Sequence, residues 1–193
     1  MAKRYGLVID QERCIGCHAC TVACKVEHAI DEGSWIKVET VGGASMDTAR
    51  GKYPELTMCY TLHFCQHCAN PPCRDACPVE AISQRPDGIV LIDKDKCNGC
   101  RACLDACPYD AISFNEESNL AEKCTLCAHR IDQGLEPLCV ACCEGEAMRF
   151  GDLADPSSEP SKLLARRPGY TLKPEAGTKP GVHFCPPLPH RKV

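Results

Sequence analysis

The spacing of the cysteines constrains this chain more than any other feature of its sequence. The chain has 193 residues, of which 19 are cysteines, and most of these fall into groups of four. The groups are Cys14, Cys17, Cys20 and Cys24; Cys65, Cys68, Cys73 and Cys77; Cys97, Cys100, Cys103 and Cys107; and Cys124, Cys127 and Cys139 with Cys142 or Cys143. A chain of this length forms one or two small domains, which bury limited apolar surface. We therefore expect the cysteines to supply cross-links or metal centres.

The N-terminal sequence favours metal centres over disulfides. Its apolar run, residues 5–9, is too short for the core of a secretory signal, so we expect reduced thiols. No apolar stretch approaches the roughly 18 residues of a membrane helix, which predicts a soluble chain without direct membrane insertion. The formal net charge is -4 and no long run of like charges occurs, which argues against nucleic acid as a partner.

The first and third groups share the spacing C-x2-C-x2-C-x3-C, which bacterial ferredoxins use to bind 4Fe-4S clusters. The two-residue gaps let a looped backbone direct three thiolates at one compact cluster. The fourth thiol lies a helical turn farther on, and in two-cluster ferredoxins it binds the other cluster. Groups of this kind come in pairs, and four groups therefore predict four 4Fe-4S clusters.

Zinc is the alternative for the fourth group alone. A structural zinc ion takes two well-separated pairs of ligands, and the first and third groups are too condensed for that. With Cys142 as its last member, the fourth group reads C-x2-C-x11-C-x2-C, which is an acceptable zinc spacing. Histidine ligation by His18, His63 or His67 is a further alternative, although enough cysteines are present for every site.

An internal repeat favours Cys143 over Cys142. After the last cysteine of three groups, an acidic residue follows at the third position and alanine at the fourth; the pairs are Glu80-Ala81, Asp110-Ala111 and Glu146-Ala147, counted from Cys77, Cys107 and Cys143. The gap of three residues from Cys139 to Cys143 also matches the final gap of the other groups. Cys59, Cys142 and Cys185 are then spare thiols, interpreted as small apolar side chains.

Short β-branched runs bounded by glycine, residues 6–10 and 88–93, precede two of the groups and predict strands. Residues 81–84, 111–114 and 147–150 are the predicted return strands, and residues 84–88 a hairpin turn. Pairing the second group with the third, and the first with the fourth, predicts an α+β fold of two bacterial-ferredoxin-like modules, one inserted in the other.

The predicted domain boundaries follow from this pairing. Residues 1–58 form the first part of the outer half, with an irregular, partner-packing loop at 25–58, and residues 59–115 form the inserted half. Residues 116–193 complete the outer half and add a short helix and an extended tail with prolines at 174–181 and 185–190. Ser157, Ser158 and Ser161 are the candidate helix caps.

Several longer motifs resemble one known family: "NPPC", "CPYDAI", "KCTLCAHRIDQGLEPLC", "FGDLADP" and "LKPEAGTKP". Together with the order of the groups, they resemble the iron-sulfur electron-transfer subunits of molybdenum or tungsten pterin oxidoreductases. These are the small subunits of dimethyl sulfoxide, polysulfide, thiosulfate and arsenate reductases and of pyrogallol-phloroglucinol transhydroxylase. The resemblance covers nearly the whole chain. One departure is Glu144, which stands where family members usually have a proline after the last cysteine.

The resemblance implies four 4Fe-4S clusters in a line and assigns their ligands. The implied sets are Cys14, Cys17, Cys20 and Cys143; Cys24, Cys124, Cys127 and Cys139; Cys65, Cys68, Cys73 and Cys107; and Cys77, Cys97, Cys100 and Cys103. Basic residues beside the groups could raise the potentials of individual clusters, although for any one of them an ordinary solvated side chain is the simpler interpretation. They are Arg13, Lys25, Lys94, Lys96, Arg101, Lys123 and Arg130.

The sequence thus predicts a non-catalytic subunit, because no catalytic constellation is visible in it. It would act as a wire between an external redox partner and the pterin metal of a large molybdenum or tungsten catalytic subunit, with a membrane anchor or another electron carrier as a further partner. The alternatives are a stand-alone polyferredoxin, an electron-transfer subunit of an aldehyde-oxidoreductase-type tungsten enzyme, and a zinc-stapled interaction module. We expect a cytoplasmic location, with co-export to the periplasm alongside a partner as the alternative.

Overall fold

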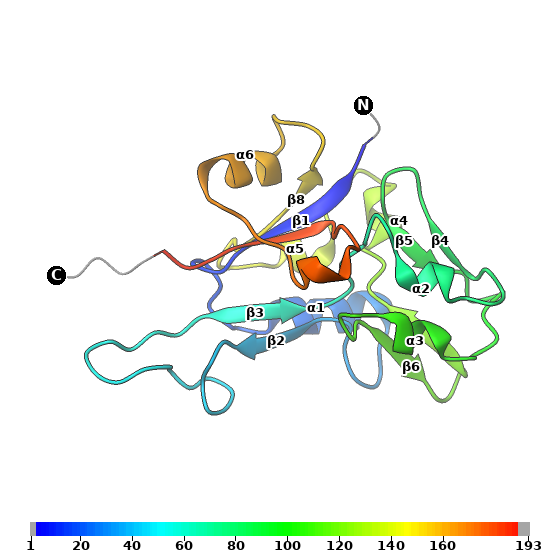
Figure 1. The fold of residues 1–193 in the computed structure, drawn as a ribbon, viewed down its shortest axis with the longest axis horizontal. Coiled ribbons are helices and arrows are strands. Elements are labelled where there is room, and N and C mark those ends of the chain that lie inside the picture. Colours follow the sequence, from blue (N-terminus) through cyan, green and yellow to red (C-terminus); the bar gives the residue numbers. More distant parts are fainter. Residues whose placement is uncertain (1–2, 189–193) are drawn as a thin grey trace.

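A small sheet joins the two ends of the chain in the computed structural model, which describes residues 3–188. Its central strand is β1 (Tyr5–Asp10), which pairs antiparallel with β8 (Met148–Asp152) and parallel with β9 (Val182–Cys185). Figure 1 shows these three strands side by side although they are distant in sequence. The strand predicted at residues 6–10 is confirmed, and its partners come from far along the chain.

The other strands form antiparallel pairs. They are β2 (Lys37–Thr40) with β3 (Tyr60–His63), β4 (Ile82–Gln84) with β5 (Val90–Ile92), and β6 (Ile112–Asn115) with β7 (Leu120–Lys123). The return strands predicted at 81–84, 111–114 and 147–150 are confirmed as β4, β6 and β8. The turn between β4 and β5 is also confirmed, because Gly88 adopts a positive φ of 90° and donates its N–H to the carbonyl of Arg85. The result is a mixed α+β structure with small sheets.

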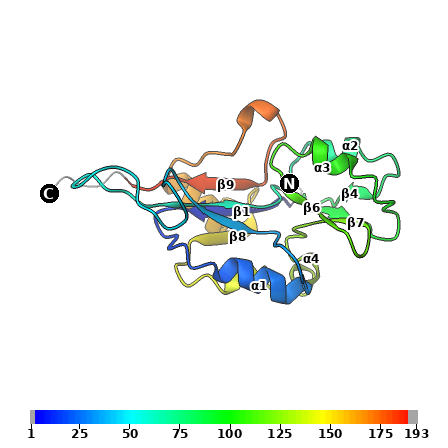
Figure 2. The same ribbon diagram turned by 90° about the horizontal axis from the view of Figure 1, so that it is seen from below.

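Short helices follow the cysteine loops. The helices are α1 (Ala19–His28), α2 (Pro72–Asp75), α3 (Ala102–Ala106), α4 (Ala128–Ile131), α5 (Leu138–Ala141) and α6 (Glu159–Arg166). Figures 1 and 2 place α2 and α3 with β4 to β7 at one end of the molecule, away from the sheet around β1. Within residues 3–188, none of the helices has the length and apolar character needed to cross a membrane.

Helix α6 confirms the predicted capped helix near the C-terminus. The hydroxyl of Ser158 accepts the N–H of Ser161 at 3.3 Å, so Ser158 is the cap among the three serines proposed. Pro160 lies in the first turn, where its missing N–H costs no intrahelical hydrogen bond. The helix packs against β8 and β1.

The C-terminal segment differs from the extended tail that the sequence predicts. Residues 182–185 form β9 of the sheet, and residues 174–176 form a turn of 3-10 helix. Val182 and Phe184 are fully buried because alternate side chains of β9 face the core. The proline-rich stretch 185–190 is described only as far as residue 188, and its last two residues lie outside the described part of the chain.

The segment 25–58 is also more regular than predicted, since it contains the end of α1 and the whole of β2. Residues 41–59 form the long connection between β2 and β3, which extends away from the body in both ribbon views (Figures 1 and 2). Met46, Tyr53 and Leu56 are exposed along it. The strand β7 was not predicted, and its pairing with β6 crosses the predicted boundary between residues 115 and 116.

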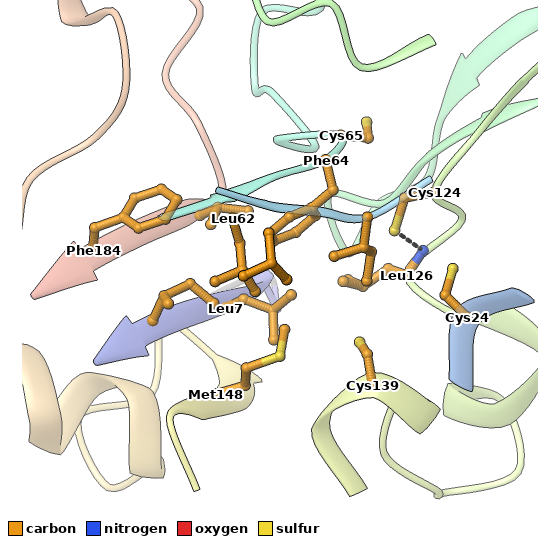
Figure 3. Close-up of a cluster of buried hydrophobic side chains, with 14 of the residues drawn as sticks. Leu7, Cys24, Leu62, Phe64, Cys65, Cys124, Leu126, Cys139, Met148 and Phe184 are labelled. Atoms are coloured by element: carbon orange, nitrogen blue, oxygen red, sulfur yellow. Dashed lines mark hydrogen bonds between the residues drawn. The ribbon is translucent and has the colours of Figure 1, made fainter. Parts of the chain in front are cut away.

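The buried side chains form two cores in the described residues. The large core contains Leu7, Leu62, Phe64, Leu126 and Phe184 among its residues (Figure 3). The small core consists of Cys73, Ile82, Val90, Cys103, Ile112 and Ala121. Both cores contain cysteines, so some of the thiols lie within the packed interior.

Candidate metal centres

Each set of four cysteines surrounds a cavity of its own in the part of the chain that the structure describes. Site I is lined by Cys14, Cys17, Cys20 and Cys143; site II by Cys24, Cys124, Cys127 and Cys139; site III by Cys65, Cys68, Cys73 and Cys107; and site IV by Cys77, Cys97, Cys100 and Cys103. The space inside them, counting the part that opens to solvent, is about 390, 310, 320 and 310 Å³, in the same order. Because their sizes and linings are alike, we interpret them as four sites of one kind.

The last cysteine of every sequence group lines the cavity of a different group. Helix α1 shows why, because Cys20 lines site I whereas Cys24, one turn later, lines site II. Helix α5 packs against α1, and along it the two sites are reached in the reverse order. Cys139 lines site II, and Cys143 just beyond the helix lines site I. The same exchange relates sites III and IV through Cys77 and Cys107. The structure brings together all sixteen cysteines in the sets that the resemblance implies.

The residue before the second cysteine of each group adopts a positive φ. The angles are 69° at Gly16, 43° at His67, 72° at Gly99 and 55° at Leu126. This left-handed conformation is costly for residues other than glycine, and such strain clusters at functional sites. At Gly16 glycine is also required by space, because a Cβ would lie 2.4 Å from ring carbons of Tyr60. The loops therefore keep a common shape that turns successive cysteines toward one cavity.

The repeated acidic-alanine pair has a structural explanation. Glu80, Asp110 and Glu146 all adopt positive φ, between 48° and 51°. The turn directs the N–H of the next alanine back to the cysteine, so that Ala81 donates to Cys77 Sγ and Ala147 to Cys143 Sγ, both at 3.3 Å. Such hydrogen bonds to sulfur help to set the potential of an iron-sulfur cluster.

The three spare thiols lie outside these cavities. The Sγ of Cys142 points to the carbonyl of Cys139 at 3.6 Å, and Cys142 is not part of the lining of site I. Cys185 is fully buried in β9, and Cys59 is partly buried. The structure therefore assigns Cys143, and not its neighbour, to a cavity.

The sites differ in their exposure. All four cysteines of site II are buried, as are Cys65, Cys68 and Cys73 of site III. Sites I and IV each contain one exposed cysteine, Cys17 and Cys100. Both are the second cysteine of their group, so the two open sites are exposed through the same part of the loop. Figure 3 shows Cys24, Cys124 and Cys139 of site II around a common space beside Leu126.

Burial determines the protonation of the thiols. It raises the pKa of Cys24 and Cys73 to about 12, so these groups are neutral thiols at pH 7 unless a positive ion offsets the cost of a buried thiolate. A bound metal supplies that charge and removes the proton. Four converging thiols, an apolar cavity and N–H groups directed at sulfur are what an iron-sulfur cluster requires. Within residues 3–188, no three cysteine, histidine or acidic side chains are close enough together to hold a single metal ion.

The three histidines considered as alternative ligands lie in different surroundings. His67 is buried and its Nδ1 accepts the N–H of Val90 at 3.1 Å, and it is not part of the lining of site III. His18 lies in the lining of site I, and His63 pairs with Glu39 at 3.1 Å.

Sequence reasoning missed His28, which lines site II with its Nε2 3.4 Å from Cys127 Sγ. Burial lowers the pKa of His28, so the neutral ring can donate one N–H to this sulfur. Its position on α1, four residues after Cys24, was the available signal.

Comparison with known proteins identifies the family. Residues 56–153 match the model of a 4Fe-4S dicluster domain, and residues 5–26 match a 4Fe-4S binding domain. The protein belongs to the 4Fe-4S dicluster family. This dicluster protein is 43% identical to a subunit of the tetrathionate reductase of Salmonella typhimurium, over 94% of this chain and 72% of the relative.

Two other relatives show the same relationship. The identity is 41% to a subunit of the sulfite dehydrogenase of Allochromatium vinosum, over 97% of this chain and 83% of the relative. It is 38% to one chain of the polysulfide reductase of Wolinella succinogenes, over 96% of the length of each. The dicluster protein is therefore an iron-sulfur electron-transfer subunit of the molybdopterin oxidoreductase type. It is an electron carrier rather than a catalytic subunit, as the sequence predicts.

Proposed function

We propose that the protein holds four 4Fe-4S clusters, one at each of sites I to IV, and passes single electrons along them between a redox partner and the pterin metal of a larger catalytic subunit. The observation that carries this proposal is that sixteen cysteines divide into four sets around four cavities of similar volume in the described residues. A 4Fe-4S cluster supplies a one-electron store at a potential set by its surroundings.

The cysteines that line each cavity are the proposed ligands. Around them the chain excludes water from sites II and III and directs backbone N–H groups at sulfur, as Leu126 does to Cys124 Sγ at 3.4 Å. These groups keep each site in one geometry, so little rearrangement accompanies the gain or loss of an electron.

We also propose the order IV, III, II, I for the line of clusters. Sites I and II share helices α1 and α5, and sites III and IV exchange Cys77 and Cys107. Sites II and III adjoin through Lys123, which lines site III and precedes Cys124 of site II. The exposed Cys17 and Cys100 then mark the two ends of the line, where electrons enter and leave.

The modular architecture is part of the same proposal. The β1–β8 pairing supports an outer ferredoxin-like half that carries sites I and II, and the small core supports an inserted half that carries sites III and IV. Because β7 pairs with β6, we place the end of the inserted half after residue 123 and not after residue 115. The remaining domain boundaries are those predicted from the sequence.

The partner and the location complete the proposal. Three of the relatives are named as one component of a reductase or dehydrogenase, which supports a catalytic subunit as partner. The long, exposed β2–β3 connection is the proposed packing surface for it. We propose a cytoplasmic location, and fractionation of cells that express the untagged chain with its partner would distinguish this from co-export to the periplasm.

Metal analysis of anaerobically purified protein tests the cofactor proposal. We expect about sixteen irons and about sixteen acid-labile sulfides per chain, with paramagnetic centres that appear on reduction. Zinc without sulfide would contradict it. Mass spectrometry of the co-purifying proteins tests the partner: a large subunit with a pterin metal supports the proposal, whereas a chain that purifies alone with full iron indicates a stand-alone polyferredoxin.

A further inference from the structure

One lysine lies between the two inner sites. Lys123 directly precedes Cys124 of site II, and its side chain lines the cavity of site III. Only 3% of the residue is accessible to solvent. Its Nζ donates hydrogen bonds to the carbonyl oxygen of Val90 and, at 3.0 Å, to that of Cys124. The backbone on both sides therefore fixes the ammonium group between the two cavities.

The surroundings of this ammonium group contain no carboxylate partner. None of the ion pairs within residues 3–188 includes Lys123. Two carbonyl dipoles replace part of its lost hydration, but a buried charge without a counter-charge is strongly unfavourable. A 4Fe-4S cluster held by four thiolates is anionic, and sites II and III would place one on each side of the lysine. The clusters are thus the counter-charge that this position requires.

The same position in other groups has a different environment. Lys96 precedes Cys97 as Lys123 precedes Cys124, but 64% of its side chain is exposed and its Nζ lies 3.8 Å from Asp93. Arg13 precedes Cys14 and pairs on the surface with Glu146 at 3.0 Å. Water and the neighbouring carboxylates screen those charges. In this comparison only Lys123 has a charge that acts through a low-dielectric interior.

We propose that Lys123 tunes the potentials of the two inner clusters, raising both above the values they would have beside a neutral residue. Reduction adds one electron to a cluster, and a fixed positive charge nearby stabilises the reduced form. Only an electron moves in this step, and no bond forms or breaks. Because one charge faces both sites, it raises the two potentials together. The difference in potential between sites II and III therefore changes little. This inference rests on the proposed function.

Potentiometric titration of the anaerobically purified full chain with its partner, followed by electron paramagnetic resonance, tests the role of Lys123. Lys123→Met removes the charge and keeps much of the side-chain volume. We expect two of the four centres to shift to lower potential, with an equilibrium constant for reduction lower by on the order of tenfold. Lys123→Arg keeps the charge and should leave all four potentials close to those of the wild type.

Lys96→Met is the matched control, since it removes the same charge at the same place before a cysteine group but from an exposed side chain. Lys96→Met should shift the potential of every centre by less than Lys123→Met shifts the potentials of the two inner centres. If Lys123→Met fails to assemble its clusters, Lys123→Gln takes its place, because an amide can still donate hydrogen bonds to Val90 and Cys124.

Several results would overturn the inference and leave the proposed function intact. They are unchanged potentials in a neutral variant with full iron, an equal shift of all four centres, or a Lys123→Arg protein that behaves like the neutral variants. Loss of the clusters in both neutral variants would also overturn it, since Lys123 would then be a structural residue. A wild-type protein without iron and sulfide would instead refute the proposed function itself.

Discussion

The two cores of the molecule differ in what they can stabilise without metal. The large core packs aromatic and long aliphatic side chains, such as Leu7 of β1, Phe184 of β9 and Phe64 just after β3. The small core contains no aromatic residue, and two of its six buried residues are cysteines. Small domains with little apolar surface depend on added cross-links or metals. The region around the small core is therefore held together mainly by its cysteine sites, whereas the region around the large core has an apolar interior of its own.

Removal of iron and sulfide should have the largest effect and should separate the two regions. We expect amides of β4 to β7 to lose most of their protection from hydrogen exchange, because the small core alone cannot order residues 72–123. Amides of β1, in the centre of its sheet, should remain measurably protected. Mass spectrometry of exchange in the holo and apo forms measures both. Equal loss of protection in the two regions would show that the large core also depends on its clusters.

Phe184→Ala should sharpen the comparison from the side of the large core. Phe184 is fully buried in β9, so its truncation should lower the free energy of unfolding by about 3–5 kcal/mol. Tyr53→Ala removes an aromatic ring that is 89% exposed and should change stability by less than about 0.5 kcal/mol. Denaturant titration of the holo protein provides both values. A small effect at Phe184 would mean that β9 contributes little to this core.

Gly16→Ala tests the contact of site I with the large core. The new methyl group would meet Tyr60, and alanine is strained at a φ of 69°, so we expect a loss of about 1–3 kcal/mol together with reduced iron content. Gly134→Ala is the control, because it has a φ of 77° but no atoms within 4 Å of the new Cβ. Its cost should be about 1–2 kcal/mol, with full iron. Equal iron loss in both variants would argue against the steric explanation.

The smallest effect concerns an ion pair that links the two regions. Arg85, in the turn after β4, donates hydrogen bonds to Asp132 beyond α4 at 2.9 and 2.6 Å, and these lower the pKa of Asp132. Asp132→Asn should reduce the melting temperature slightly at low salt and not at high salt, because exposed pairs are weak and screened. Asp31→Asn, which removes an exposed carboxylate without an ion pair within residues 3–188, should have no effect at either salt concentration.

Features that depend on local spacing could be predicted from the sequence. The hairpin of β4 and β5, the strand β1 and the cap at Ser158 follow from turn glycines, β-branched residues and serine positions. The grouping of the cysteines around the cavities was implied by the resemblance to a known family, and the repeat after three of the groups selected Cys143 over Cys142. Their ligation of clusters stays a prediction that metal analysis can test.

Features that depend on distant contacts could not be predicted. The strand β9 lies among prolines and has only four residues. It forms because one edge of β1 is free to pair with it, and this pairing places Phe184 in the buried core. The strand β7, "LAEK", has no β-branched residue and is defined by its pairing with β6. The burial of Lys123 is likewise invisible in the sequence, where it cannot be told apart from the exposed Lys96.

The position of β1 in its sheet has a consequence for synthesis. This strand leaves the ribosome before its partners β8 and β9, which lie about 140 and 175 residues later in the chain. At a synthesis rate of roughly 5–20 residues per second, β1 waits on the order of ten to thirty seconds for its second partner. Until β8 is made both edges of β1 are open to chaperones or to other nascent chains, and one edge stays open until β9 is made. Sites I and II each take a cysteine from residues 139–143, so neither can be completed before that stretch of the chain has been made.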